Sequence, residues 1–293
     1  MPARAAHRAS WMAPGTATGD LLYVSDPGYG AVFVYTYSPF GMKFVGMLTG
    51  TSAPGAMCVD KLQNVWVLSY PGTGSYAALE YAHGGTQPIA MLVDPAGYPT
   101  GCAVDPISGN LAISSGAQAG EQPTIAVFNK ARGKPGLFTD PSIPGFYNCC
   151  AYDDKGNLFG NGTVDQNQNL ILAELPKGSS TFKSVPMHRD FLRVGGIQWD
   201  GQYLTVGDKY DGLIIQYEIT ANGGREIGST TLNGVTALDQ YFIDRHRVIA
   251  ANDDYANPPG AFVGIFRYPA GGQRIRIRPF SAPYAVVVSR APR

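Results

Sequence analysis

The chain has 293 residues, enough to bury one or two substantial cores, and a formal net charge of zero with only 15% charged residues. Zero net charge provides no general field to attract nucleic acid or anionic lipid, and no stretch approaches the ~18 apolar residues of a membrane span. Glycine (37), proline (22) and tyrosine (17) are abundant, which favours short strands joined by tight turns.

Residues 1–19 lie outside the pattern that organises the rest of the chain. They contain basic residues but no apolar core of a signal peptide, although a chain trimmed after its signal would look the same. We predict that they form an N-terminal arm, with Trp11 and Met12 as an apolar anchor on the main domain.

From residue 20 onward one phrase recurs: a short apolar run that ends in an aspartate. A tight turn and then an asparagine with an apolar pair follow most copies, which is typical of strand, turn, strand. The aspartates that end these runs are Asp60, Asp105, Asp153, Asp200 and Asp244, and Ser289 stands in the same place in the last copy. A third and a fourth strand follow in each unit, and four strands at a period of roughly 40–50 residues indicate a β-propeller blade.

The ends of the chain indicate how the ring of blades closes. The first unit begins with DLLYVSD, which has no inner strand before it, and the chain ends with FSAPYAVVVS, which has no second strand after it. We therefore predict an all-β fold: one six-bladed β-propeller over residues 20–293, with four-stranded antiparallel blades and a ring closed by the C-terminal strand. The stretch Arg274–Pro279 alternates arginine with apolar residues and is interpreted as a charged outer edge strand.

The segment LLYVSDPGYGAVFVYTY resembles the NHL-type repeat, in which a strand, Val-Ala-Asp, a Gly/Asn turn and another strand follow one another. As architecture the resemblance covers nearly the whole chain and implies a six-bladed propeller of the NHL or TolB-like type. Propellers of this shape include hydrolases, lactonases, synthases, scaffolds and ligand receptors, so the resemblance implies no single activity.

All four cysteines fall on innermost strands, in three successive blades: Cys58, Cys102, Cys149 and Cys150. Their spacing does not fit a metal site, because there is no Cys-x-x-Cys and no paired histidine. We interpret them as buried structural thiols, with one disulfide as the alternative. Because side chains alternate along a strand, Cys102 can face Cys58 or Cys149 but not both, and it cannot face Cys150. A strained bond between Cys149 and Cys150 stays open.

The position five residues before each aspartate lies near the start of an innermost strand, at the mouth of the central channel. In blade order this ring comprises Tyr284, Gly55, Thr100, Asn148, Gly195 and Asp239. We predict Thr100, Asn148, Asp239 and Tyr284 as ligand-binding residues. A distant resemblance to the gluconolactonase and senescence-marker family implies Asn148 and Asp239 as ligands of a divalent cation such as Ca²⁺. The family's glutamate is missing, and two oxygen ligands are few for Ca²⁺.

The loops between second and third strands reach the same face as the channel mouth. Their aspartates, Asp26, Asp208 and Asp253, are interpreted as caps of their own loops. The alternative is a polar cup for a neutral sugar or a peptide, with tyrosines Tyr29, Tyr70, Tyr210 and Tyr255. His188 precedes Asp190 in a loop that we expect on this face. It is a second catalytic candidate beside Asp239, although an exposed histidine is more often plain surface.

These observations favour a binding or scaffold module that acts outside the cytoplasm, secreted or periplasmic. We expect a monomer that binds a small polar molecule, a sugar or a protein partner, and no nucleic acid. The alternative is a divalent-metal-dependent lactonase or hydrolase with its site at the channel. No Gly-rich phosphate loop suggests nucleotide binding. The stretch Asn161–Thr163 matches a glycosylation sequon.

Overall fold

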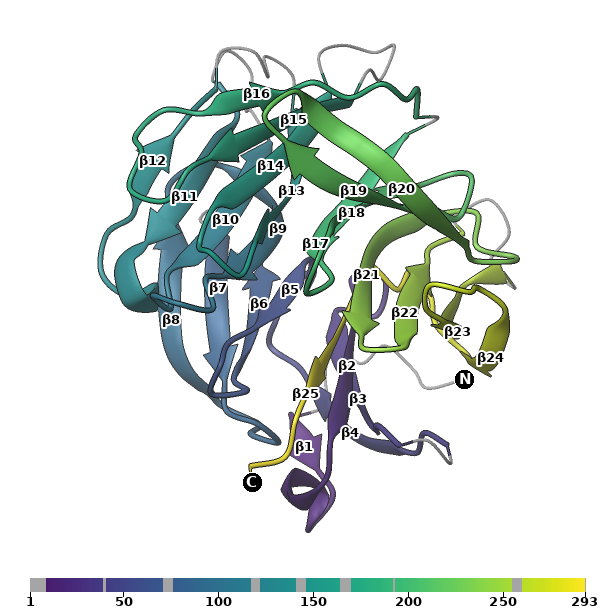
Figure 1. Ribbon diagram of the computed structural model, residues 1–293. Helices are drawn as coiled ribbons and strands as arrows, with labels where there is room; N and C mark the ends of the chain where they lie inside the picture. The colour runs from purple at the N-terminus through teal and green to yellow at the C-terminus, as the bar shows by residue number, and fades with distance from the viewer. Residues whose placement is uncertain are drawn as a thin grey trace.

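A computed structural model describes residues 9–38, 41–70, 76–116, 122–140, 146–163, 170–191, 193–254 and 260–292. In these ranges the chain is almost entirely strand and turn, with two short 3₁₀ helices, η2 (Thr16–Thr18) and η3 (Asn129–Ala131). Six blades surround a central channel, which confirms the predicted six-bladed propeller, and one pair between β10 and β13 joins blades 3 and 4 into a single sheet (Figure 1). None of the helices in the described ranges is long and apolar enough to cross a membrane.

Each blade has four antiparallel strands, which follow one another from the channel outward. Blade 1 comprises β25 (Ala285–Ser289), β2 (Leu21–Asp26), β3 (Ala31–Thr36) and β4 (Phe44–Leu48). Blade 2 comprises β5 (Met57–Val59), β6 (Val65–Ser69), β7 (Tyr76–Tyr81) and β8 (Pro88–Asp94). Blade 3 comprises β9 (Tyr98–Val104), β10 (Leu111–Gly116), β11 (Thr124–Phe128) and β12 (Gly136–Phe138). Blade 4 comprises β13 (Phe146–Tyr152), β14 (Leu158–Thr163), β15 (Leu170–Leu175) and β16 (Lys183–Val185). Blade 5 comprises β17 (Val194–Trp199), β18 (Leu204–Asp208), β19 (Leu213–Thr220) and β20 (Gly223–Thr231). Blade 6 comprises β21 (Leu238–Asp244), β22 (Arg247–Asn252), β23 (Phe262–Arg267) and β24 (Gln273–Ile277).

The C-terminal strand closes the ring, as predicted. β25 pairs with β2 from Leu21↔Ser289 to Ser25↔Ala285, and in Figure 1 the yellow strand lies beside the purple one. Arg290, directly after β25, forms ion pairs with Asp20, at 2.5 Å, and with Asp244 of blade 6. The first and last segments of the ring are therefore joined by backbone pairing and by charge.

The hydrophobic core lies between the blades, because each blade packs both faces against its neighbours. Along β2, Leu22 and Val24 pack with residues of blade 6, whereas Leu21 and Tyr23 pack with residues of blade 2. This explains why β2 is buried along its whole length and why its first four residues are apolar without a polar alternation.

The N-terminal arm adds a fifth strand to blade 1. Within it, β1 (Trp11–Met12) pairs with β4, and the Trp11 ring meets the edge of Phe44 at 5.4 Å. A side chain at Gly46 would collide with Met12, so the glycine makes room for the anchor. The predicted apolar anchor is confirmed.

The arginine-rich stretch forms the outer edge of blade 6, as predicted. β24 is the outermost strand of its sheet, and the Arg276 guanidinium carbon lies 3.8 Å from the centroid of the Phe262 ring. A charged edge discourages pairing with a strand of another chain.

The recurring aspartates hold the turns between first and second strands. Asp153 accepts hydrogen bonds from the backbone and the side-chain amide of Asn157, both at 2.8 Å, and Asp60 does the same with Asn64 at 2.8 and 3.1 Å. The repeated Asp–Asn phrase is therefore a turn device. We call the face with these turns the lower face, and the face where the innermost strands begin the upper face.

Candidate functional site

The predicted ring coincides with an irregularity that recurs in four blades. In β9 and β13 the pairing register shifts so that Thr100 and Asn148 have no partner opposite them. In β17 and β21 the shift spans Gly195–Gly196 and Asp239–Gln240. Such bulges bend a strand and re-aim its side chains, and they are frequent next to functional sites. Counting back from the aspartate thus identified a distinct structural position.

The bulged side chains are bonded to neighbouring blades. The buried Thr100 hydroxyl lies 3.0 Å from the Ser114 carbonyl oxygen and 2.9 Å from that of Tyr147 in blade 4. The Tyr284 hydroxyl donates to the Thr100 carbonyl at 3.3 Å, which brings two of the predicted ligand-binding residues into contact. The Asn148 amide nitrogen donates to the Gly195 carbonyl at 2.7 Å.

Asp239 carries the ring's one carboxylate, and Lys209 neutralises it. The Lys209 ammonium pairs with the Asp239 carboxylate, and both side chains are largely buried, at 19% and 14% exposure. Among the described residues no group of three or more His, Cys, Asp or Glu side chains is placed to hold a metal ion. Two oxygen donors beside an ammonium group fit Ca²⁺ poorly, because Ca²⁺ prefers six to eight oxygen ligands. The calcium site stays a prediction.

Three tyrosines form a cluster at the upper face between blades 2 and 3. The ring centroids of Tyr70 and Tyr76 are 5.0 Å apart, and those of Tyr76 and Tyr98 are 5.6 Å apart. Tyr70 and Tyr98 are 40% and 55% exposed. Of the three, only Tyr70 was predicted for this face. Tyr76 ends the same loop but was not named, and Tyr98 stands at the start of an innermost strand, outside the loops between second and third strands.

The cluster continues across the channel mouth to blade 5. The pKa of Tyr98 is raised, mainly by burial and further by Tyr76 and the Asp239 carboxylate. Asp239 therefore lies close enough to act on the Tyr98 hydroxyl electrostatically. Beyond Lys209, Arg193 donates to the Tyr210 hydroxyl at 3.4 Å, and Tyr210 is 47% exposed. We call this set the upper-face band: Tyr70, Tyr76, Tyr98, Asp239, Lys209, Tyr210 and Arg193.

The other predicted upper-face residues have different surroundings. Tyr29 packs edge-on against Phe33 at 5.7 Å, and Asp26 accepts backbone hydrogen bonds from Tyr29, Ser281 and Ala282, as expected of a loop cap. Tyr255 lies outside the described residues.

His188 is exposed and lies along the flank of blade 5. The residues on either side of it contact β20: Met187 lies against Gly224, and Arg189 pairs with Glu226 at 3.1 Å. The predicted placement of this loop at the mouth therefore holds for Arg193 and not for His188.

The cysteines divide into a disulfide and two buried thiols. Cys58 and Cys102 are bonded, with a Cα–Cα distance of 5.7 Å, whereas Cys149 and Cys150 are free and buried. The preferred interpretation of four buried thiols is therefore wrong for one pair. The parity argument is confirmed, because Cys102 bonds one of its two permitted partners and not Cys150. Burial raises the pKa of both free thiols, which keeps them protonated at neutral pH.

The sequon asparagine is part of the core. Asn161 is fully buried, accepts a hydrogen bond from the Cys149 backbone at 2.9 Å and donates to the Gly195 carbonyl at 2.9 Å. It offers no surface to a glycan, and we give it a structural role.

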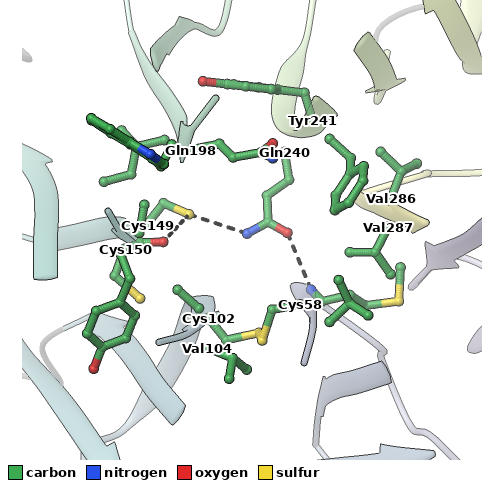
Figure 2. A pocket seen from close by; sticks show the side chains of 18 of the residues that line it. Cys58, Cys102, Val104, Cys149, Cys150, Gln198, Gln240, Tyr241, Val286 and Val287 are labelled. Carbon is green, nitrogen blue, oxygen red and sulfur yellow. Dashed lines mark hydrogen bonds between the residues drawn. A yellow bond between two sulfur atoms is a disulfide. The ribbon is translucent and has the colours of Figure 1, made fainter. Parts of the chain in front are cut away.

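One side chain, Gln240, spans the channel below the ring. It starts from blade 6, donates to the Cys149 sulfur of blade 4 at 3.5 Å and accepts from the Met57 backbone of blade 2 at 3.4 Å (Figure 2). The equivalent residues of the other blades are small: Ala56, Gly101, Cys149, Gly196 and Ala285. Five small residues and one glutamine form a signal in the sequence that its interpretation missed.

Below Gln240 the channel widens into a cavity of about 330 Å³. All six innermost strands contribute to its wall, and the disulfide is part of it (Figure 2). The channel thus has two separate ends, a polar mouth above and a cavity below.

Comparison with known proteins identifies the architecture. No family model and no curated protein matches the sequence. Among solved structures, the chain is similar to one in the crystal structure of a nidogen/laminin complex, with a TM-score of 0.72, 12% identity, and 93% of this chain and 99% of that chain covered. It is also similar to a protein of unknown function from Bacteroides caccae, with a TM-score of 0.67, 13% identity and the same coverages. At these identities the likeness shows a six-bladed propeller fold and no more.

Proposed function

We propose that this chain is an extracytoplasmic binding module that recognises a protein partner with its upper face. The exposed tyrosine cluster is the observation that carries the proposal. Tyrosine and arginine are enriched among the residues that dominate protein interfaces, because they bury a large area at low entropic cost and keep a polar end. The upper-face band supplies four such residues with exposed or half-exposed rings and a guanidinium, namely Tyr70, Tyr98, Tyr210 and Arg193.

A flat partner suits this face better than a small polar ligand. The hollow beside the cluster, lined by Tyr70, Tyr76 and Tyr98, has a volume of about 40 Å³. That is little more than the ~30 Å³ share of one water molecule in the liquid, so a sugar would find no enclosure there. The Asn148 amide and the Asp239 carboxylate, which a small ligand would use, are already bonded within the protein.

Two further observations support a location outside the cytoplasm and a protein partner. The Cys58–Cys102 disulfide favours an oxidising compartment, consistent with a secreted or periplasmic protein. The structural relative comes from a complex of nidogen with laminin, in which a protein of similar fold was crystallised with a protein partner. The recurring Asp–Asn turn supports the finer NHL or TolB-like assignment, which stays part of the proposal.

The experiment compares three forms of the protein as bait for extracellular proteins of the native source. These are the wild type, the double variant Tyr70→Ala/Tyr98→Ala, and Leu137→Ala, which removes a 54% exposed side chain from the outer strand β12. A partner captured by the wild type should bind Leu137→Ala equally and the double variant about tenfold or more weakly. Equal binding of all three forms, with unchanged melting temperatures, would contradict the proposal.

A divalent-metal-dependent lactonase or hydrolase at the channel has less support. Its site would need a free carboxylate at the ring, and the Asp239 carboxylate is paired with Lys209. We therefore do not extend the proposal to catalysis.

A further inference from the structure

We propose that the lower half of the channel is a binding site for a small uncharged molecule that consists of an aromatic ring with one polar substituent, of the phenol or indole class. This site is separate from the upper-face band, and it does not depend on the proposed function.

The size and the opening of the cavity fit a small ligand. Its volume of about 330 Å³ equals the share of about ten water molecules and lies at the lower end of the range for small-molecule sites. Side chains at its inner end, such as Cys149, Gln240 and Val286, are buried. Those nearer the aspartate turns, such as Val104 and Trp199, are partly exposed, so the cavity opens at the lower face.

The wall is mostly apolar and carries no charge. It consists largely of aliphatic and aromatic side chains and the disulfide, and includes Val104, Ile197, Trp199, Phe242 and Val287. No Asp, Glu, Lys, Arg or His occurs among the described residues that line the cavity. A charged ligand would lose its hydration here and gain no partner, which is costly, whereas an apolar ring gains by leaving water.

The titratable groups of the wall do not alter this conclusion. They are the thiols of Cys149 and Cys150 and the phenols of Tyr152 and Tyr241. Burial raises the pKa of all four, so each is uncharged at neutral pH.

The closed end of the cavity offers one polar group with spare capacity. An amide side chain can donate two hydrogen bonds and accept two. Gln240 makes one bond in each direction: it accepts from the Met57 backbone at a long 3.4 Å, and it donates to a thiol, which is a weak acceptor. Gln198 differs, because its oxygen and nitrogen are both bonded to the Ile243 backbone, at 2.8 and 3.3 Å, which fixes its side chain. A hydroxyl or ring N–H on the ligand can therefore meet Gln240 while the ring packs against the wall.

The test uses fluorinated probes and ¹⁹F NMR on the whole chain, with 4-fluorophenol, fluorobenzene and 4-fluorobenzoate. We expect 4-fluorophenol to bind saturably, fluorobenzene to bind about fivefold more weakly for lack of one hydrogen bond, and 4-fluorobenzoate not to bind. Gln240→Met should remove the preference for the phenol over fluorobenzene. Absence of 4-fluorophenol binding up to its solubility limit, or equal binding of the benzoate, overturns the proposal.

A filling variant locates the binding. Val104→Trp puts a large ring at the open end of the cavity and should weaken 4-fluorophenol binding about tenfold or more. Its control is Leu62→Trp, in a turn of the same face, where Leu62 is 73% exposed and does not line the cavity. Ala103→Leu is a second filling variant if the first does not fold. Unchanged binding in a folded filling variant, or equal loss in the control, overturns the proposal.

Discussion

The upper end of the central channel is bordered by tyrosines and an ion pair, whereas a few residues further along the same innermost strands the wall is mostly apolar and includes a disulfide. The difference begins at the bulges around Thr100, Asn148 and Asp239, which re-aim side chains toward neighbouring blades. Below them the strands pair regularly and present apolar residues. One repeat can thus build two unlike surfaces, and Gln240 separates them.

Removal of the C-terminal strand should unfold the whole domain and so destroy the upper face and the lower cavity together. Deletion of residues 284–293 exposes the inner edge of β2 and removes four side chains that are at most 2% exposed, Ala285 to Val288. Their burial contributes on the order of 5–10 kcal/mol, comparable with the whole stability of a domain. We expect calorimetry to show no cooperative transition. A truncated chain that melts at the parental temperature would refute the ring closure.

Loss of the disulfide should act on the lower end first. Cys58→Ala/Cys102→Ala removes a cross-link between residues 44 apart, which the chain-entropy model values at ~4 kcal/mol. We expect a lower denaturant midpoint and weaker 4-fluorophenol binding, with upper-face partner binding retained in the folded protein. The control for the denaturant midpoint is Cys150→Ala, which leaves the cross-link intact; it is not a control for 4-fluorophenol binding, because Cys150 lines the cavity. Equal midpoints for the wild type and the double variant would contradict this prediction.

A change at the upper end should weaken partner binding at the upper face and leave 4-fluorophenol binding in the lower cavity unchanged. Lys209→Met leaves the largely buried Asp239 carboxylate without its cation, at a cost of ~1–3 kcal/mol. We expect partner binding to fall and 4-fluorophenol binding to stay. Lys155→Met, at an exposed turn, is the control and should change neither. The separation of the two ends is wrong if Lys209→Met alters the lower cavity as strongly.

The two ends should also respond differently to pH. Burial raises the pKa of Asp20 at the lower face, but hydrogen bonds from the Ala291 backbone and Arg290 outweigh it, so the pKa lies below its ordinary value. This group stabilises the fold above its unfolded pKa of about 3.9, and the contribution of ~1 kcal/mol is lost as pH falls through the lower folded value. Asp20→Asn should flatten this acid limb of the stability curve, measured by urea titration between pH 2 and 5.

Asp26, at the upper face, should show the opposite sign. Burial raises its pKa more strongly than four backbone hydrogen bonds lower it. Its favourable contribution is therefore complete below the unfolded pKa and is lost as pH rises through the folded value. The same titration on Asp26→Asn should remove that loss; a variant with the wild-type pH dependence would contradict the assignment.

The smallest expected effect concerns calcium at the upper mouth. With Lys209 on Asp239, millimolar Ca²⁺ should leave the melting temperature unchanged, because an ion stabilises the native state only if it binds it. A saturable rise in the wild type that disappears in Asp239→Asn would instead support the predicted site at Asn148 and Asp239, and with it the lactonase alternative.

The sequence predicted the fold well because its signals are local. The Asp–Asn turns, the strand lengths and the unpaired strand at each end are enough to count six blades and close the ring. The site was predicted less completely: the spacing located the bulged positions, but it does not show the direction in which a bulge points the side chains. Two partners for Cys102 remained open, Cys58 and Cys149. The alternation of side chains along a strand shows which neighbouring blade a cysteine faces, but it does not give the distance between two sulfur atoms. Tyr76, Tyr98 and Gln240 were missed because their roles depend on contacts between blades.

Ring closure by β25 also means that the fold can be completed only at the end of translation. Ser25 of β2 and Ala285 of β25 are partners 260 residues apart, so at 5–20 residues per second a ribosome needs on the order of 10–50 s to supply the second after the first. Through that interval the inner edge of β2 is an unpaired apolar strand, open to pairing with another chain. Two chains that meet in this interval can exchange their last strands, because the edge of β2 that β25 covers is the same in every copy.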